Sequence, residues 1–293
     1  ATGNDQFAIG CETSRWIAGD SSFNVTLAGI ATVTASTGVV EATKFCGDGS
    51  CLTGISAGFE PDADENLVAG TNAGANLDGT SGCYNVFLGQ CAGRCTTSGA
   101  DNIFLGQEAG KLATTGDFNI SLGKQALGYN TLTGDKNIVL GCEAAHGVDS
   151  GSCNIIMGTR SGLSVTSGNC NVFIGNCAGA SIDTQSDSVF IGNLAGQGKN
   201  DGVKDVIIGC EAGRSSGGSN NVLLGTTAGC TVTGVANVFL GLCAGRNVTS
   251  GNVNIAIGFD AMMGDGSTAV TGDYNIAFGK LALGVCAVTG TNN

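Results

Sequence analysis

The fold of this chain is decided by a phrase that residues 85–106 spell out in full: NVFLGQCAGRCTTSGADNIFLG. An asparagine opens a short apolar run, a glycine closes it, Ala-Gly follows, and a polar turn leads to the next asparagine. Self-similarity of this kind is typical of repeat architectures. The run-closing glycines are mostly 17 residues apart, within a range of 16 to 21. These glycines are Gly70, Gly89, Gly106, Gly123, Gly141, Gly158, Gly175, Gly192, Gly209, Gly225, Gly241, Gly258 and Gly279.

Each unit is too short for a helix pair or a propeller blade. β-branched and aromatic residues fill the apolar runs and glycines bracket them, which predicts strands. The polar segments predict turns, where glycine supplies positive φ. The sequence therefore predicts an all-β protein: a parallel β-solenoid of about thirteen rungs of roughly 17 residues. At about 4.8 Å per rung the stack would be roughly 60 Å long.

Alternation along the strands predicts self-association. In Val86-Phe87-Leu88 the outer two residues point one way and Phe87 points the other. Both faces are therefore apolar, and only one of them can fill the coil interior. Middle residues such as Phe104 and Phe173 would form a sticky stripe if they were exposed. We expect identical chains to cover that stripe, as a homotrimer.

The asparagine that opens each strand has two structural interpretations. Stacked Asn side chains can hydrogen-bond along the rod as a ladder, or Asn simply tolerates the backbone dihedrals of a corner. The residues of the expected ladder are Asn85, Asn102, Asn119, Asn137, Asn154 and Asn171.

Residues 1–60 have a different pattern and predict a separate β-rich segment. Phe7–Gly10 resembles one degenerate rung, and residues 23–27 and 30–34 read as strands. A break at residues 58–65 holds the single proline, Pro61, and a cluster of four acidic residues, which marks the boundary. We expect the shaft to run over 61–293 and to continue beyond residue 293, since Thr289–Asn293 reads as the lead-in to another repeat.

A family resemblance rests on two motifs. The phrase KFCGDGSCLTGI at 44–55 resembles a segment of phage tail-fibre and related virion proteins, especially those of marine cyanophages. The repeats at 66–284 resemble repeats in the same fibres and, more distantly, are similar to the head repeats of trimeric autotransporter adhesins, which form left-handed parallel β-rolls in trimers. The resemblance covers almost the whole chain. It implies a virion appendage that contacts other virion proteins and reaches a host receptor through a tip.

Composition and charge argue against several other functions. The net charge of −12 and the absence of a basic run predict no nucleic-acid partner. No apolar stretch reaches the about 18 residues of a membrane span, so no membrane insertion is expected. His146 is the one histidine and no Ser-His-Asp set can be assembled, which predicts no enzyme and no cofactor. Asp117, Asp135 and Asp273 recur in turns, where capping or calcium binding are both open.

The 14 cysteines suggest two disulfides. Cys153 and Cys170 each precede a strand asparagine one repeat apart, so stacking would bring their Cα atoms within disulfide range. Cys46 and Cys51 bracket a Gly-rich loop and are the second candidate pair. No CxxC pair is present, which argues against zinc.

Together these features predict the structural shaft of a phage fibre that extends a host-recognition tip. A bacterial surface adhesin or extracellular filament subunit is the first alternative, and it would place the chain on a bacterial cell surface. A glycan-cleaving spike and an ice-binding solenoid are the others. Paired carboxylates would carry the cleavage, whereas Glu108, Glu143, Glu211 and Asp260 lie on separated rungs, and no Thr-x-Thr array runs along the repeats.

Overall fold

The chain forms two compact units, residues 1–56 and 57–293. The computed structural model describes the backbone of five strands in the first unit, and residues 61–199, 202–264, 270–284 and 289–292 of the second. The division falls four residues before the boundary expected at Pro61. The candidate cysteines Cys46 and Cys51, and the motif at 44–55, lie outside the described residues.

The first unit is an antiparallel meander in the strand order β1-β2-β3-β4-β5. Phe7–Gly10 lies in β1, which pairs antiparallel with β2. The expectation of a degenerate rung there was wrong, because a solenoid rung would need a parallel neighbour. The strands are β1 Asp5–Cys11, β2 Ser14–Asp20, β3 Val25–Leu27, β4 Ala31–Thr34 and β5 Val39–Ala42.

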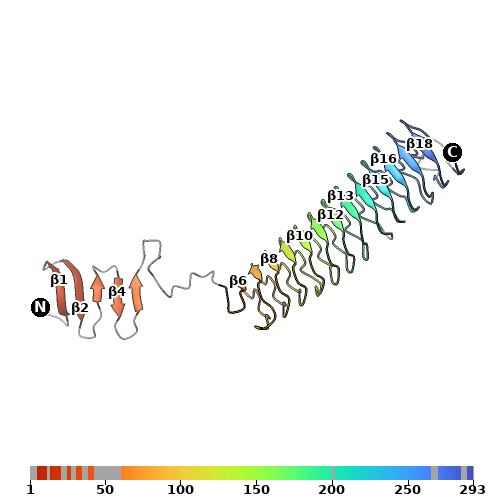
Figure 1. The fold of residues 1–293 in the computed structure, drawn as a ribbon. Coiled ribbons are helices and arrows are strands. Elements are labelled where there is room, and N and C mark those ends of the chain that lie inside the picture. The colour runs from red at the N-terminus through yellow and green to blue at the C-terminus, as the bar shows by residue number, and fades with distance from the viewer. Residues whose placement is uncertain are drawn as a thin grey trace. The chain divides into compact units, whose positions relative to one another are not determined.

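The second unit is the predicted parallel β-solenoid, with 13 strands stacked in sequence order (Figure 1). Every neighbouring pair is parallel and in register; Val172, Phe173 and Ile174, for example, lie beside Val189, Phe190 and Ile191. The strands are β6 Leu67–Ala69, β7 Val86–Leu88, β8 Ile103–Leu105, β9 Ile120–Leu122, β10 Ile138–Leu140, β11 Ile155–Met157, β12 Val172–Ile174, β13 Val189–Ile191, β14 Val206–Ile208, β15 Val222–Leu224, β16 Val238–Leu240, β17 Ile255–Ile257 and β18 Ile276–Phe278.

We name each rung by its strand. The part of the chain that the structure describes holds no helix that is long and apolar enough to cross a bilayer. Each three-residue strand is followed by a corner, a return segment and a second corner, which bring the chain back under the next strand (Figure 1).

The run-closing glycine is required by the stacking of backbones. Gly141 has a φ of 140°, and a Cβ added to it would lie 2.5 Å from the carbonyl oxygen of Gly158 in the next rung. An L side chain rarely adopts such a φ and has no room there. The two corners also hold non-glycine residues in the left-handed region, such as Glu143 with φ 54° and Cys153 with φ 61° in the β10 rung.

The coil interior is built from two matched positions. The middle strand residue points inward and is fully buried, as in Phe104, Val139 and Phe239. The return segment contributes a buried alanine and, directly after it, a residue in the left-handed backbone conformation that faces the middle strand residue. We call the second one the left-handed residue. Neighbouring rings stack within the core, with centroids 5.0 Å apart for Phe87 and Phe104.

The sizes of these two positions are complementary within each rung. Where the middle residue is Phe239, the left-handed residue is Gly245, and a Cβ there would collide with the ring. Where the middle residue shrinks to Ala256, the left-handed residue is Met262, which is fully buried. Ser121 is matched with Leu127 in the same way. Where the middle strand residue is as small as Ser121 or Ala256, a large side chain from the return segment therefore fills the space in the coil.

This size matching predicts a compensated double substitution in the β16 rung. Phe239→Ala alone should cost about 3 to 5 kcal/mol because it leaves a cavity, and Gly245→Met alone should destabilise by overpacking against the ring. The double variant copies the Ala256–Met262 pair and should recover most of the loss. Urea denaturation of the three variants measures the coupling. Additive losses would contradict the proposed pairing.

Candidate functional site

The strand asparagines form a continuous buried ladder along the stack. The backbone N–H of Asn102 donates to Oδ1 of Asn85 at 2.9 Å, and its Nδ2 donates to the same oxygen at 3.2 Å and to the Gly116 carbonyl at 2.8 Å. Asn85, Asn102, Asn119, Asn137, Asn154 and Asn171 are all at most 1% exposed. None of them has a positive φ; the residue with a positive φ is the one before, such as Tyr84 or Asp101. The amide therefore serves hydrogen bonding between rungs.

A second ladder runs along the neighbouring corner, two residues before the asparagines. Oδ1 of Asp117 accepts the N–H of Ala100 at 2.8 Å, and Oδ1 of Asp135 accepts the N–H of Asp117 at 2.9 Å. Asp273 accepts from Asn252 in the same way, at 2.7 Å. These aspartates thus cap corner amides of the preceding rung. The sequence raised capping as one of two interpretations, but it did not reveal that the caps connect rungs.

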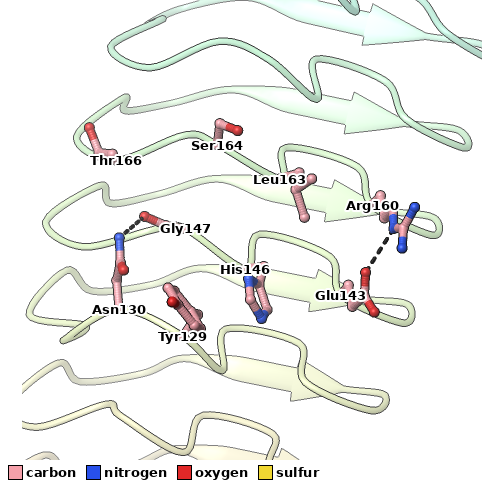
Figure 2. A pocket seen from close by; sticks show the side chains of 9 residues that line it. All are labelled: Tyr129, Asn130, Glu143, His146, Gly147, Arg160, Leu163, Ser164 and Thr166. Carbon is pink, nitrogen blue, oxygen red and sulfur yellow. Dashed lines mark hydrogen bonds and ion pairs between the residues drawn. The ribbon is translucent and has the colours of Figure 1, made fainter.

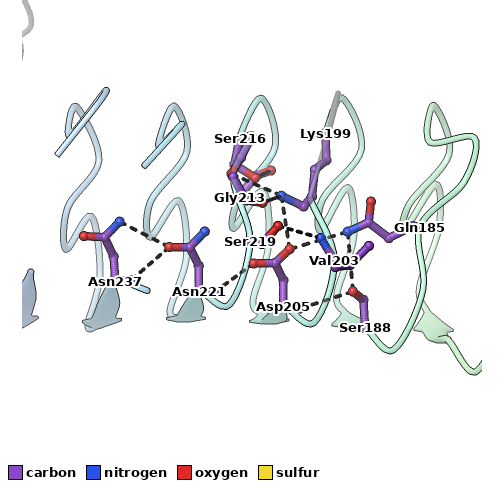
Figure 3. Close-up of polar contacts among 12 residues, drawn as sticks. Gln185, Ser188, Lys199, Val203, Asp205, Gly213, Ser216, Ser219, Asn221 and Asn237 are labelled. Atoms are coloured by element: carbon purple, nitrogen blue, oxygen red, sulfur yellow. Dashed lines mark hydrogen bonds and ion pairs between the residues drawn. The ribbon is translucent and has the colours of Figure 1, made fainter. Parts of the chain in front are cut away.

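The asparagine ladder changes its residue type at two rungs (Figure 3). Ser188 and Asp205 replace asparagine, and the chain of acceptors continues: Asp205 N–H donates to Ser188 Oγ at 3.2 Å, and Asn221 N–H donates to Asp205 Oδ1 at 2.8 Å. Lys199 enters the coil interior opposite them and is 1% exposed. Its Nζ lies 3.2 Å from Asp205 Oδ2 and donates to the Gly218 carbonyl at 2.7 Å.

Asp205 and Lys199 are therefore a buried ion pair in an otherwise apolar and amide-lined interior. Burial raises the pKa of the Asp205 carboxyl, and the nearby Lys199 ammonium acts against that shift. Gln185, also buried, reaches the same carboxylate oxygen at 3.4 Å. This cluster is not among the sites predicted from the sequence. Its signal there is a lysine at a repeat position that is Val148 or Val165 in other rungs.

The outward face of the strands is a continuous apolar stripe along the solenoid. The first and third residues of each strand from β7 to β18 point outward and are partly exposed, while the middle residue is buried. Ile155 and Met157 are 37% and 36% exposed. The prediction that middle residues such as Phe173 face a partner chain is wrong, because they point into the coil. The large rings point into the coil because the glycine of the return segment leaves room for them there.

The structure contains Cys153 and Cys170 as free, exposed thiols. The disulfide expected between them is absent, which corrects that prediction. Both residues precede strand asparagines on adjacent rungs. Their side chains repeat in parallel at the rung spacing of about 4.8 Å. A disulfide needs Cβ atoms about 3.5 to 4.5 Å apart with converging bonds. In-register stacking therefore places these thiols side by side without directing them at each other.

One surface groove gathers polar and aromatic side chains from three rungs (Figure 2). We call it the His146 groove; its volume is about 480 Å³. A bulge in the β9 rung creates it: four residues separate the buried Leu127 and Leu132, whereas two separate Ala145 and Val148 in the next rung. Its lining residues are Tyr129, Asn130, Glu143, His146, Gly147, Arg160, Leu163, Ser164 and Thr166.

The bulge orients an exposed aromatic ring. Tyr129 is 65% exposed and stacks on His146, with ring centroids 4.7 Å apart. Asn130 Nδ2 donates to the Gly147 carbonyl at 2.6 Å and so holds the bulge against the next rung. Burial lowers the pKa of the His146 imidazole, with Glu143 acting against the shift. Burial thus favours the neutral form of the imidazole. In the sequence, the sign of this bulge is the spacing of 18 residues from Gly123 to Gly141, where 17 is usual.

An ion pair forms another wall of the groove. Arg160 Nε donates to Glu143 Oε2 at 2.7 Å, and this hydrogen bond lowers the pKa of the Glu143 carboxyl. Glu108 is occupied elsewhere, by Lys111 at 3.0 Å and Gln125 at 2.8 Å. Within the described residues no group of three or more His, Cys, Asp or Glu side chains could hold a metal ion.

The geometry defines residues 57–293 as a β-solenoid with a buried asparagine ladder, a second polar ladder along one corner and an apolar strand face outside. The sequence of the chain matches no model of a known protein family and no curated protein.

Proposed function

We propose that the chain is the shaft of an elongated appendage, a phage fibre, in which identical chains associate through the outward strand face. The observation that carries the proposal is the uninterrupted apolar stripe on a stack of 13 in-register strands. Such a stack is stiff because each rung is bonded to the next by backbone hydrogen bonds and by side-chain ladders. The shaft would hold a host-recognition tip away from the particle.

The dimensions of the stripe favour a second copy of the chain as its partner. Strands three residues wide, stacked over about 60 Å, present roughly 600 Å² in projection. Each partner in a standard stable interface buries about 800 Å² of accessible surface, which is of the same order as the area of the stripe. A second copy also presents outward residues at the same rung spacing along the same length. A partner without that repeat would meet only part of the stripe.

Three copies around a common axis are the arrangement that we propose. Each chain would turn its strand face inward, and the three stripes would enclose a narrow apolar core. Closed cyclic symmetry leaves no stripe uncovered. This is consistent with partly exposed aliphatic residues such as Val189 and Ile191, which an isolated chain would leave in contact with water.

Charges placed on the stripe should abolish the assembly and leave the rungs folded. We expect the double variant Ile155→Glu, Met157→Lys to be a monomer by light scattering, while the unmodified protein has the mass of a trimer. Val235→Lys is the matched control, since Val235 is an apolar residue 42% exposed that lies outside the strands. A monomeric unmodified protein, or a double variant that still assembles, would disprove the interface.

A bacterial surface adhesin or filament subunit is the alternative function, since the same rod and interface would serve it. Gold-labelled antibodies against the solenoid distinguish the two by electron microscopy. Label along fibres of phage particles supports the shaft, and label on bacterial cells without phage supports the adhesin.

A further inference from the structure

We propose that the His146 groove binds the ring of a neutral saccharide, with Tyr129 as its stacking platform. This inference is independent of the shaft proposal, because the groove lies on the bulge of the β9 rung and on the return segments and corners of the β10 and β11 rungs. The strand face and the groove can therefore be occupied at the same time. A groove of about 480 Å³ also falls within the size range of small-molecule sites.

The aromatic pair supplies a flat apolar surface that is already held in place. The Tyr129 ring stacks on the His146 ring at a centroid distance of 4.7 Å, and Asn130 anchors the same bulge. A ligand therefore meets a ring that does not have to be ordered on binding, which lowers the entropic cost. A pyranose ring presents a face of C–H groups that suits such a platform, because a tyrosine ring is apolar on its face and polar at its tip.

The rim of the groove supplies both donors and acceptors for hydroxyl groups. Arg160 bonds Glu143 through Nε, and its terminal nitrogens make no hydrogen bond with the described residues. The Ser164 hydroxyl also has no protein partner among them. The Glu143 carboxylate retains acceptor sites. A sugar hydroxyl both donates and accepts, so adjacent hydroxyls can bond the carboxylate and the guanidinium together.

The charges in the groove favour a neutral ligand. Glu143 remains ionised because Arg160 donates to it, so an anionic ligand would meet this carboxylate in a chain whose net charge is −12. A cationic ligand would compete with Arg160 for the same carboxylate. A polyhydroxylated ring disturbs neither partner of the ion pair. These constraints together point to an uncharged hexose or N-acetylhexosamine.

Nuclear magnetic resonance tests the site directly, since the chain has one histidine and three tyrosines. The assembled protein is titrated with D-glucose, D-galactose and N-acetyl-D-glucosamine, and with glycerol as a polyol that has no ring. We expect at least one of the sugars to shift the His146 and Tyr129 ring signals and to leave Tyr84 and Tyr274 unchanged. Glycerol should shift none of them.

Matched variants distinguish the site from general surface effects. Tyr129→Ala should weaken binding about tenfold, since it removes an aromatic contact, whereas Tyr84→Ala removes an equally exposed tyrosine and should not change it. Arg160→Gln should also weaken binding, and all variants should keep the mass of the unmodified assembly. No shift with any sugar, equal shifts with glycerol, or unchanged affinity in Tyr129→Ala would overturn the proposal.

Discussion

Gly141→Ala is expected to destabilise the solenoid by about 2 to 6 kcal/mol. The substitution places a residue with a Cβ at a φ of 140° and 2.5 Å from the Gly158 carbonyl oxygen. The backbone strain costs roughly 1 to 3 kcal/mol, and displacing the next rung adds a packing cost of about 1 to 3 kcal/mol. Amide hydrogen exchange should show the loss in the β10 and β11 rungs, because contacts in a solenoid reach only neighbouring rungs.

Gly279→Ala is the control that separates the two costs. Gly279 follows β18 and has a φ of 115°, but no atom of the described residues lies within 4 Å of where its Cβ would be. The control retains the dihedral strain and lacks the collision, so we expect a loss of only about 1 to 3 kcal/mol. Equal losses in the two variants would show that contact between the stacked glycines is unimportant.

Lys199→Met is the second substitution with a large expected effect. It leaves the Asp205 carboxylate buried without its cation, and breaking one partner of a buried ion pair typically costs about 3 to 5 kcal/mol. The double variant Lys199→Met, Asp205→Asn instead restores an asparagine to the ladder and an apolar residue to the coil. We expect it to be as stable as the unmodified protein or about 1 to 4 kcal/mol more stable. Urea denaturation measures both.

The same pair predicts a pH dependence with a defined sign. Burial holds the folded-state pKa of Asp205 above its unfolded value. The folded state therefore binds more protons between the two values, and the contribution of Asp205 to stability falls as the pH rises through that window. The stability advantage of the double variant should consequently shrink as the pH is lowered towards the unfolded pKa of Asp205. An advantage that grows on acidification would mean that the carboxyl is not destabilised by burial.

The solenoid was predictable because its decisive signals are local and repeated. The spacing of glycines such as Gly158 and Gly175 gave the length of the rung, and the apolar runs gave the strands. Alternation correctly placed Phe173 on the face opposite to Val172 and Ile174, but it could not say which face points inward. That choice depends on the return segment, where glycine opposite phenylalanine leaves room for the ring.

The candidate sites were less predictable, since they arise from departures from the repeat. Lys199 is buried in the coil, where its Nζ lies 3.2 Å from Oδ2 of Asp205 on the next rung. Tyr129 and His146 are separated by a strand and a corner in the sequence, and they meet because stacking brings consecutive return segments together. The Cys153–Cys170 disulfide failed as a prediction because Cα separation alone does not specify where the side chains point.

The ladders have a further consequence for the length of the rod. Each rung offers the next one the same acceptors at the same places, and even Ser188 and Asp205 preserve the chain of amide-to-side-chain bonds. Away from the β13–β14 junction, where Lys199 pairs with Asp205, whole repeats can therefore be duplicated or deleted without leaving a mismatched junction. A gene encoding such a chain can change the reach of its product by recombination between repeats, in steps of one rung.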